Sequence, residues 1–272
     1  MIEYKNIKWY KYHGALLPRV APHQEICLSK KEAKELLKKS SAYFLRYTNE
    51  WDRKDGNFWY VIKDTQEGLD QYKSKIRNQI KRGLKNCIVE KVDKTIIANK
   101  AYNTYIEAFK NYSTFIIPVS DEKFKNSILS STDDFWAVYN KDGELIAYAN
   151  NIVENNMCHY NSMKFHPEFL NLYPSYALIY TMNEYYLNHK KYRYVSDGAR
   201  SISHDTNIQD FLIKKFNFRK ASVKLNVAYR WDISILVNIL FPIRGILKRI
   251  NHSLITKILV LLKQEEIRRS YE

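Results

Sequence analysis

A β-hairpin is predicted by the stretch FWAVYNKDGELIAYA, residues 135–149. Two runs rich in aromatic and aliphatic side chains flank Asp142-Gly143, a dipeptide that favours the tight turn between antiparallel strands. After this hairpin the pattern predicts strands at 157–163, 192–196 and 222–229, and helices at 172–188 and 207–216. The order from about residue 134 is therefore β-β-β-α-β-α-β. It indicates an α/β (α+β) fold.

The N-terminal half contains a strongly basic helix. Helices are expected at 29–40, 71–86, 96–112 and 122–130, and strands at 44–48 and 58–62. Within 71–86, Tyr72, Ile76, Ile80 and Leu84 repeat every four residues and form one apolar face. The other faces carry six Lys and Arg residues, and no acid follows Asp70. These cations have no acidic partner on the helix, so the face is either a solvated surface or a binding site for an anion.

The overall charge also favours an anionic partner. The 272 residues carry a formal net charge of +15, which suits nucleic acid, an anionic membrane surface or a phosphorylated ligand such as coenzyme A. Cys27, Cys87 and Cys158 lie far apart, with no metal-binding or redox spacing. Neither a signal peptide nor a membrane span is expected, so we expect a cytoplasmic protein with reduced thiols.

The C-terminal tail differs from the rest of the chain. Residues 233–240 are apolar, Pro242 interrupts them, and 246–262 predicts a basic amphipathic helix. Such a helix either docks on the protein's own body or on a twin subunit, or it attaches to an anionic membrane surface.

One motif connects the second half to a known superfamily. Asn207 and Phe218 are eleven residues apart, and Lys215, Phe216 and Asn217 stand just before Phe218. This pattern resembles a motif of GNAT acyltransferases, in which an Asn precedes by eleven residues the Phe of a Gly-Phe pair. The β-β-β-α-β-α-β order also resembles the layout of a GNAT domain. The resemblance implies a GNAT-like mixed central sheet flanked by helices, and a coenzyme A thioester, acetyl-CoA or another acyl-CoA, as the acyl donor.

The same resemblance implies where the cofactor would bind. The backbone N–H groups of Ser175, Tyr176 and Ala177 would meet its phosphates, because a helix N-terminus attracts anions. Asn207 and Arg200 would contribute further cofactor contacts.

Two positions depart from the pattern of typical GNAT enzymes. The stretch LYPSYA, residues 172–177, has no glycine, unlike the phosphate loop of typical GNAT enzymes, and Ile213 replaces their usual general-acid tyrosine. Fem-type peptidyltransferases also lack the glycine-rich loop. The stretch SKIRNQIKRGLK, residues 74–85, resembles the Arg-rich helix that precedes their GNAT-like fold. Those enzymes pass aminoacyl groups from tRNA to a cell-wall precursor, so the likeness implies tRNA as a possible partner and Arg77 as a substrate-binding residue.

Fem-type enzymes have two complete GNAT-like halves, whereas the N-terminal half looks reduced here. We expect an N-terminal α/β region at 1–95, a GNAT-like acyltransferase domain at 96–231, and a basic helical tail at 232–272.

The densest polar cluster is SDGARSISHDT, residues 196–206. It follows a predicted strand and precedes a predicted helix, which is where ligands bind in open α/β sheets. Asp197 or His204 is the expected general base for an acyl acceptor. Arg200 is expected to pair with a phosphate or carboxylate. Turn formation and helix capping are the alternative explanation for this cluster.

Further candidates lie in the neighbouring segments. Tyr173 is a candidate proton donor to the leaving thiolate. Tyr160 and Asn161 lie on the strand whose edge would bind the donor's pantetheine arm in a GNAT protein. His166 is either a substrate contact or a structural residue.

The sequence thus predicts an acyltransferase that acts on an amine or hydroxyl of a small-molecule, sugar or lipid-linked cell-envelope precursor, with peripheral attachment to the inner membrane face as an option. Two other hypotheses stay open: a non-catalytic nucleic-acid-binding protein and a degenerate GNAT scaffold. The oligomeric state is also open.

Overall fold

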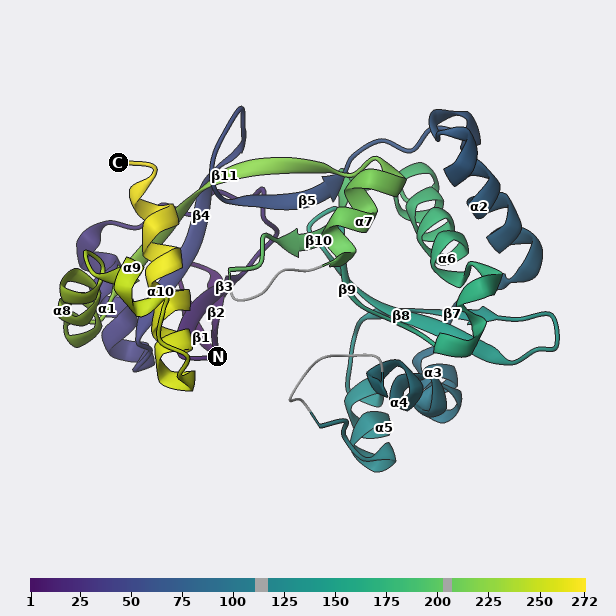
Figure 1. Ribbon diagram of the computed structural model, residues 1–272, viewed down its shortest axis with the longest axis horizontal. Helices are drawn as coiled ribbons and strands as arrows, with labels where there is room; N and C mark the ends of the chain where they lie inside the picture. Colours follow the sequence, from purple (N-terminus) through teal and green to yellow (C-terminus); the bar gives the residue numbers. More distant parts are fainter. Residues whose placement is uncertain (111–116, 203–206) are drawn as a thin grey trace. The chain divides into compact units, whose positions relative to one another are not determined.

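The computed structural model describes residues 1–110, 117–202 and 207–272 (Figure 1). The chain divides into two compact units. Unit 1 consists of Met1–Val61, Ala199–Asn207 and Lys220–Glu272, and unit 2 consists of Ile62–Gly198 and Ile208–Arg219. This division differs from the expected boundaries at 95/96 and 231/232. The reason is that strands from both ends of the chain pair with each other inside unit 1.

Unit 2 contains a mixed sheet in the order β10-β9-β8-β7-β6. Its strands are β6 (Ile88–Val92), β7 (Asp134–Tyr139), β8 (Leu145–Glu154), β9 (Met157–Phe165) and β10 (Tyr194–Ala199). Neighbours from β6 to β9 are antiparallel, and β10 runs parallel to β9. The predicted hairpin is present as β7 and β8. At its turn the Asn140 side chain accepts hydrogen bonds from the backbone N–H groups of Asp142 (3.0 Å) and Glu144 (2.9 Å).

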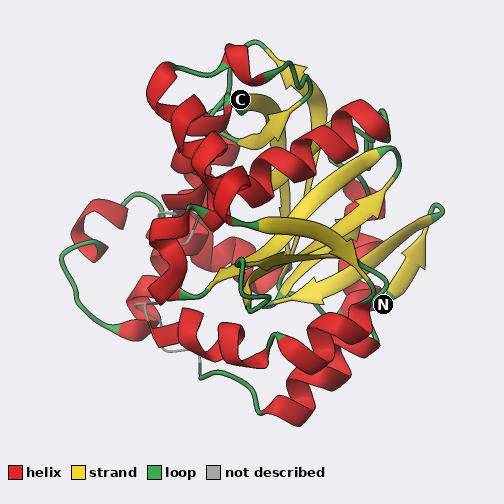
Figure 2. Cartoon of the chain, turned by 90° about the vertical axis from the view of Figure 1, so that its right-hand side faces the viewer, coloured by secondary structure: helices red, strands yellow, loops and turns green. Residues whose placement is uncertain are grey.

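Helices flank the strands of unit 2 on both faces (Figures 1 and 2). They are α2 (Ser74–Asn86) and α6 (Pro174–Asn183) on one face, and α3 (Lys94–Lys100), α4 (Tyr102–Lys110) and α5 (Asp121–Leu129) on the other. The helix α7 (Asn207–Phe216) has its expected bounds. The predicted order from residue 134 is confirmed as β7-β8-β9-α6-β10-α7-β11.

The helix expected at 96–112 is two helices. The chain breaks at Ala101, where φ is −94° and ψ is −2°, outside the usual helical values. Ala101 is fully buried and packs in one apolar cluster with Ile97 and Phe124. The break follows from this packing, which sequence periodicity does not reveal. Residues 111 and 112 of the expected helix lie outside the described residues.

The strands of unit 1 are paired in the order β1-β2-β3-β4-β11-β5. They are β1 (Ile2–Tyr4), β2 (Ile7–Tyr12), β3 (Ala15–Arg19), β4 (Phe44–Arg53), β5 (Trp59–Lys63) and β11 (Arg219–Tyr229). The helix α1 (Lys30–Ser40) begins with a capping box, in which Ser29 and Glu32 bond each other's backbone N–H groups. Its apolar face packs on the sheet through Leu36, against Trp9 and Leu45.

The tail folds as three helices of unit 1: α8 (Trp231–Leu240), α9 (Arg244–Leu247) and α10 (Ser253–Arg269). Val237, Leu247 and Leu262 form a buried cluster that joins the three helices. The expected single helix at 246–262 is divided between α9 and α10. Within the described ranges, no helix combines the length and apolar character that crossing a bilayer requires.

Candidate active site

Two neighbouring strands of unit 2 stop pairing partway along their length. The register of the parallel pair β9 and β10 ends at Ser196↔His159, although β9 continues to Phe165. On its other side β9 stays paired with β8 and carries a one-residue bulge at Asn161. A bulge bends its strand and often lies next to an active site. Beyond Ser196 and His159, β9 is therefore no longer paired with β10.

His159 lies at the point where this pairing ends. Its Nδ1 atom is 3.2 Å from the backbone carbonyl oxygen of Ser196. A carbonyl only accepts, so Nδ1 carries the proton and the neutral ring keeps a lone pair on Nε2. Burial lowers the pKa of His159, while the Ser196 carbonyl opposes this shift. The imidazole is therefore neutral at pH 7 and can accept a proton or a hydrogen bond at Nε2.

Gly198 fixes the place of this imidazole ring. Its φ is +86°, and a Cβ added there would lie 3.1 Å from Cε1 of His159. The Gly198 backbone N–H also donates to the Ser196 hydroxyl at 3.0 Å. A residue with a side chain would both strain the backbone and push against the ring.

Asp197 lies between Ser196 and Gly198 in the sequence, and the pKa of its carboxyl group is strongly perturbed. Burial raises the pKa of Asp197 from 3.8 to about 7, and a hydrogen bond with the Gln209 side chain of α7 partly opposes that effect. A group that titrates near the working pH is suited to both accept and release a proton. Perturbed carboxyls of this kind are enriched at functional sites.

The His159 imidazole and the Asp197 carboxyl point to opposite faces of the sheet. Ser196 and His159 are register partners, so their side chains share one face, and the next residue, Asp197, points to the other. A ligand that entered where β9 and β10 separate would therefore meet an imidazole on one side and a carboxyl on the other. This arrangement can deprotonate an acceptor and return the proton to a leaving group.

The expected phosphate site at the start of α6 is crowded. The N–H groups of Tyr176 and Ala177 already donate to the Tyr173 carbonyl, at 3.1 and 3.2 Å. Pro174 has no N–H to offer. A Cβ added at Gly83 of α2 would lie 2.6 Å from the same Tyr173 carbonyl, so α2 packs closely over this end of α6. Of the three amides that the resemblance implied, the Tyr176 and Ala177 amides are thus already engaged.

Tyr173 and Arg77 lie on the same side of unit 2. Tyr173 has a left-handed conformation, with φ +62° and ψ +41°, and the Arg82 guanidinium sits over its ring at 5.0 Å. Arg77 forms an exposed ion pair with Asp70 at 3.4 Å. Both predicted residues remain at the surface of α2 and α6 rather than at the separated strands.

Three other predicted residues have different surroundings. Tyr160 is buried and donates its hydroxyl to Asn183 Oδ1 at 2.8 Å, so it belongs to the core. Asn161 is the exposed bulge residue of β9. His166 is buried against Phe169, and its Nδ1 has no hydrogen-bond partner among the described residues.

The remaining predicted residues do not join this site. Arg200 belongs to unit 1, where it donates to the Asn57 carbonyl at 2.6 Å and stacks 4.5 Å from the Trp59 ring centroid. Asn207 is exposed at the start of α7. His204 lies outside the described residues.

The structure adds His159, which the sequence did not single out. The available signal was its place beside Tyr160 and Asn161 in a predicted strand. What makes the residue notable is its contact with Ser196 and Gly198, and that contact depends on the strand register.

Two of the three cysteines are buried, whereas Cys27 is an exposed free thiol. Burial raises the pKa of Cys87 to about 11 and also raises that of Cys158, so both remain thiols at neutral pH. No cluster of His, Cys, Asp and Glu suited to a metal ion occurs in the described part of the chain.

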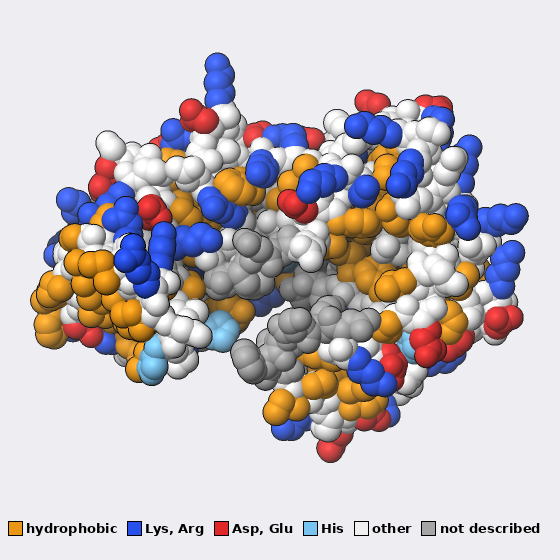
Figure 3. Space-filling view, viewed as in Figure 1, with side chains coloured by type: hydrophobic (Ala, Val, Ile, Leu, Met, Phe, Trp, Pro, Cys, Tyr) orange, Lys and Arg blue, Asp and Glu red, His pale blue; other side chains and the backbone are white. Residues whose placement is uncertain are grey.

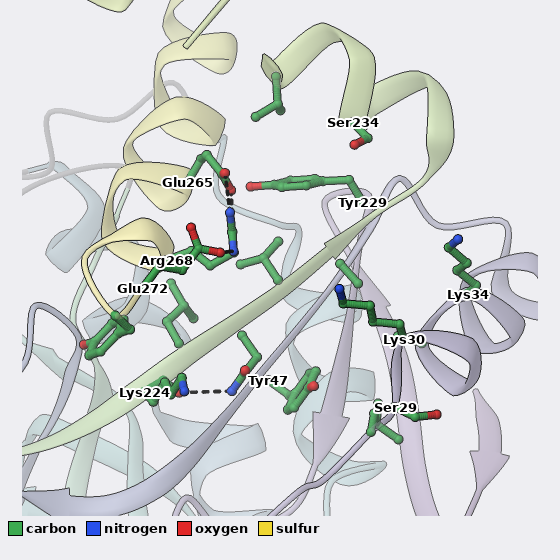
Figure 4. Close-up of a pocket in the computed structure, with 18 of the residues that line it drawn as sticks. Ser29, Lys30, Lys34, Tyr47, Lys224, Tyr229, Ser234, Glu265, Arg268 and Glu272 are labelled. Atoms are coloured by element: carbon green, nitrogen blue, oxygen red, sulfur yellow. Dashed lines mark hydrogen bonds and ion pairs between the residues drawn. The ribbon is translucent and has the colours of Figure 1, made fainter. Parts of the chain in front are cut away.

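Unit 1 has a cavity of about 630 Å³ between the tail and the sheet (Figure 4). Several of the charged groups that line it form ion pairs. Arg268 contacts Glu265 at 2.8 Å and Glu272 at 2.6 Å, and Lys224 contacts Glu50 at 3.3 Å. Lys30 and Lys34 also line the cavity, and the sequence did not single out any of its residues as a site.

Comparisons with known proteins identify the fold. A scan of family models finds no match, and a sequence search of curated proteins finds none either. Similar solved structures include FemX, with a TM-score of 0.53 and 11% identity over 79% of this chain and 81% of that one. The C-terminal domain of an Agrobacterium fabrum protein assigned as a lysylphosphatidylglycerol synthetase has a TM-score of 0.55 and 10% identity, over 86% and 85% of the two chains. A conserved protein of unknown function from Bacteroides thetaiotaomicron has a TM-score of 0.52 and 11% identity, over 79% of each chain. Together with the strand and helix order of unit 2, these similarities show that the chain has a GNAT-like fold of the Fem type.

Proposed function

We propose that this protein is an acyltransferase that moves an acyl group from an activated donor to an amine or hydroxyl acceptor. The observation that carries the proposal is the Asp197 carboxyl, with a pKa of about 7, at the point where two paired strands separate. The GNAT-like fold supports it, because acyl and aminoacyl transferases share this fold.

In the proposed reaction Asp197 acts as the general base. It takes a proton from the acceptor nitrogen or oxygen as this atom attacks the acyl carbon, and it then returns the proton to the leaving group. His159 holds a fixed lone pair on Nε2, which accepts a hydrogen bond and positions a reacting N–H or O–H group. Main-chain N–H groups of β9 beyond His159 would stabilise the developing oxyanion.

The donor is either an acyl-CoA thioester or an aminoacyl ester of tRNA. Coenzyme A needs a site for its pyrophosphate, and the Tyr176 and Ala177 amides at the start of α6 are already engaged with the Tyr173 carbonyl. The cationic side chains of α2, by contrast, offer an extended surface to a polyanion. Both observations favour an aminoacyl-tRNA donor over acetyl-CoA. An envelope precursor is the acceptor that this choice suggests.

The test measures donor consumption at several pH values. Wild type is incubated with acetyl-CoA, or with a pool of aminoacyl-tRNAs, in the presence of candidate amine acceptors, and free thiol or deacylated tRNA is measured. We expect aminoacyl-tRNA to be consumed at a rate that rises with pH through about 7, because the base must be ionised. Asp197→Asn should lower this rate by at least a hundredfold, the lower end of what a general base contributes.

Asp210→Asn is the matched control, because Asp210 is an exposed carboxylate on α7 that pairs with Lys214. Full activity in Asp197→Asn would remove the proposed base. Retention of tRNA with no deacylation would support the nucleic-acid-binding hypothesis, and consumption of acetyl-CoA alone would reverse our choice of donor.

A further inference from the structure

The tail helices of unit 1 carry a second apolar face, which is exposed. It consists of eight exposed large side chains, here called the tail surface: Trp231, Ile235, Leu236, Ile239, Ile243, Ile246, Ile250 and Leu254. Trp231 is 75% exposed, Ile239 63% and Ile246 64%. The tail therefore exposes some of the most apolar side chains in the chain to water.

These positions are distinct from those that dock the tail. Val237, Leu247 and Leu262 are buried in the cluster that joins α8, α9 and α10. The tail surface runs from Trp231 in α8 to Leu254 in α10, mostly at spacings of three or four residues, and its positions alternate with the buried ones. One apolar face of the tail helices is thus buried in this cluster, whereas the tail surface is not covered by the described residues. A contiguous exposed apolar patch marks an interaction site more often than a chance surface.

Cations accompany this surface, and the one acid between residues 231 and 254, Asp232, pairs with Arg230 at 2.6 Å. Between residues 233 and 263 the chain has five Lys and Arg residues and no Asp or Glu. Lys248, Arg249 and Lys257 are exposed, and Arg244 pairs with Glu266 at 3.2 Å. In Figure 3 hydrophobic side chains gather over α8, with Lys and Arg side chains beside them. The partner must therefore be both apolar and negatively charged.

We propose that the tail surface docks this protein on the surface of an anionic lipid bilayer. The apolar side chains would enter the boundary between headgroups and acyl chains, and the cations would contact the anionic headgroups. Trp231, at the start of α8, suits this boundary because indole rings prefer it. The helices lie along the membrane and do not cross it, since their inner sides are occupied by unit 1. This inference is independent of the proposed chemistry.

A second copy of the chain fits the surface less well. A symmetric dimer places the same patch of each subunit against its twin. Lys248, Arg249 and Lys257 would then face the cations of the partner, with no acid from residues 233–263 to neutralise them. An anionic bilayer removes this repulsion and buries the same side chains.

Vesicle binding of the full chain tests the proposal directly. The protein is mixed with vesicles of neutral phosphatidylcholine, or of phosphatidylcholine that contains about 30% anionic phosphatidylglycerol. The bound fraction is measured by flotation. We expect binding to the anionic vesicles, weakened by salt. The double variant Ile235→Ser with Ile239→Ser should bind at least about tenfold more weakly. Lys248→Gln with Arg249→Gln should lower binding by roughly twentyfold or more.

Matched controls distinguish binding through the tail surface from non-specific hydrophobic or electrostatic binding to the vesicles. Leu170→Ser removes an apolar side chain that is 50% exposed in unit 2, and Lys54→Gln with Lys141→Gln removes two exposed cations elsewhere. Both control variants should bind like wild type. The tryptophan emission should also shift to shorter wavelength on binding, and Trp231→Phe should lose that shift.

Three outcomes would overturn the proposal. The first is equal binding by the tail variants and the controls. The second is absence of wild-type binding to anionic vesicles at low salt. The third is a stable dimer in light scattering that dissociates in the Ile235→Ser with Ile239→Ser variant, which would assign the surface to a second copy. Circular dichroism of each variant confirms that it is folded.

Discussion

Replacing Asp197 with Asn should change the stability of the protein in a way that depends on pH. Burial raises the pKa of Asp197 from 3.8 to about 7. Between these values the folded chain keeps a proton that the unfolded chain has released, so wild-type stability falls as the pH rises. A difference of about 3 in pKa corresponds to roughly 4 kcal/mol. Because this carboxyl is partly exposed, we expect a loss of about 2–4 kcal/mol between pH 4 and pH 8.

The variant should escape this loss, because an amide does not ionise. Urea unfolding of both proteins at pH 4.5, 6, 7.5 and 8.5 gives the free energy of unfolding at each pH. The advantage of Asp197→Asn over wild type should grow up to about pH 7 and then level off. Asp210→Asn, which changes a carboxylate that is 67% exposed, should show no such trend. A constant difference between Asp197→Asn and wild type would mean that this carboxyl ionises normally in the fold, and the argument for its role as base would fail with it.

Three further substitutions test the packing that surrounds the candidate site and the tail. Gly198→Ala should cost about 1–3 kcal/mol and reduce transfer activity, because φ is +86° there and the new Cβ would press on the facing imidazole; thermal unfolding and donor consumption measure the two effects. Gly83→Ala should destabilise unit 2 by about 1–3 kcal/mol, since the Cβ would lie 2.6 Å from the rigid Tyr173 carbonyl; an unchanged melting temperature would contradict the close packing of α2 on α6. Glu265→Gln should cost about 3 kcal/mol, because it removes the carboxylate that is 2% exposed and pairs with Arg268; urea unfolding of the variant checks this value.

Much of the second half of the fold could be predicted from local patterns. The hairpin around Asp142-Gly143 and the helix at Asn207–Phe216 have strong signals, a tight-turn dipeptide and an amphipathic period. The strands β1, β2, β3 and β6 were not predicted. In β6 only Val89 and Val92 are partly buried, while Glu90 and Lys91 are exposed, so its pattern is too short to stand out. Strands of this kind gain their stability from pairing partners, which a local pattern does not contain.

The site could be predicted only in part. Asp197 was expected as a base from its place between a strand and a helix, and its raised pKa agrees with that expectation without testing it. The raised pKa itself depends on burial, which arises from packing across unit 2. His159 was missed because its tautomer is set by the Ser196 carbonyl, a partner 37 residues away in sequence.

Unit 1 is built from segments that lie far apart in the sequence, and this has a consequence for the synthesis of the chain on the ribosome. Unit 1 begins with residues 1–61 but also needs residues 220–272, and about 160 residues separate the two segments. At 5–20 residues per second, roughly 10 to 30 seconds pass before the second segment is available. During that interval β4 waits for β11, its antiparallel partner over residues 44–53. An unpaired strand edge invites association with other chains, so the nascent protein should depend on a chaperone until its last fifty residues emerge.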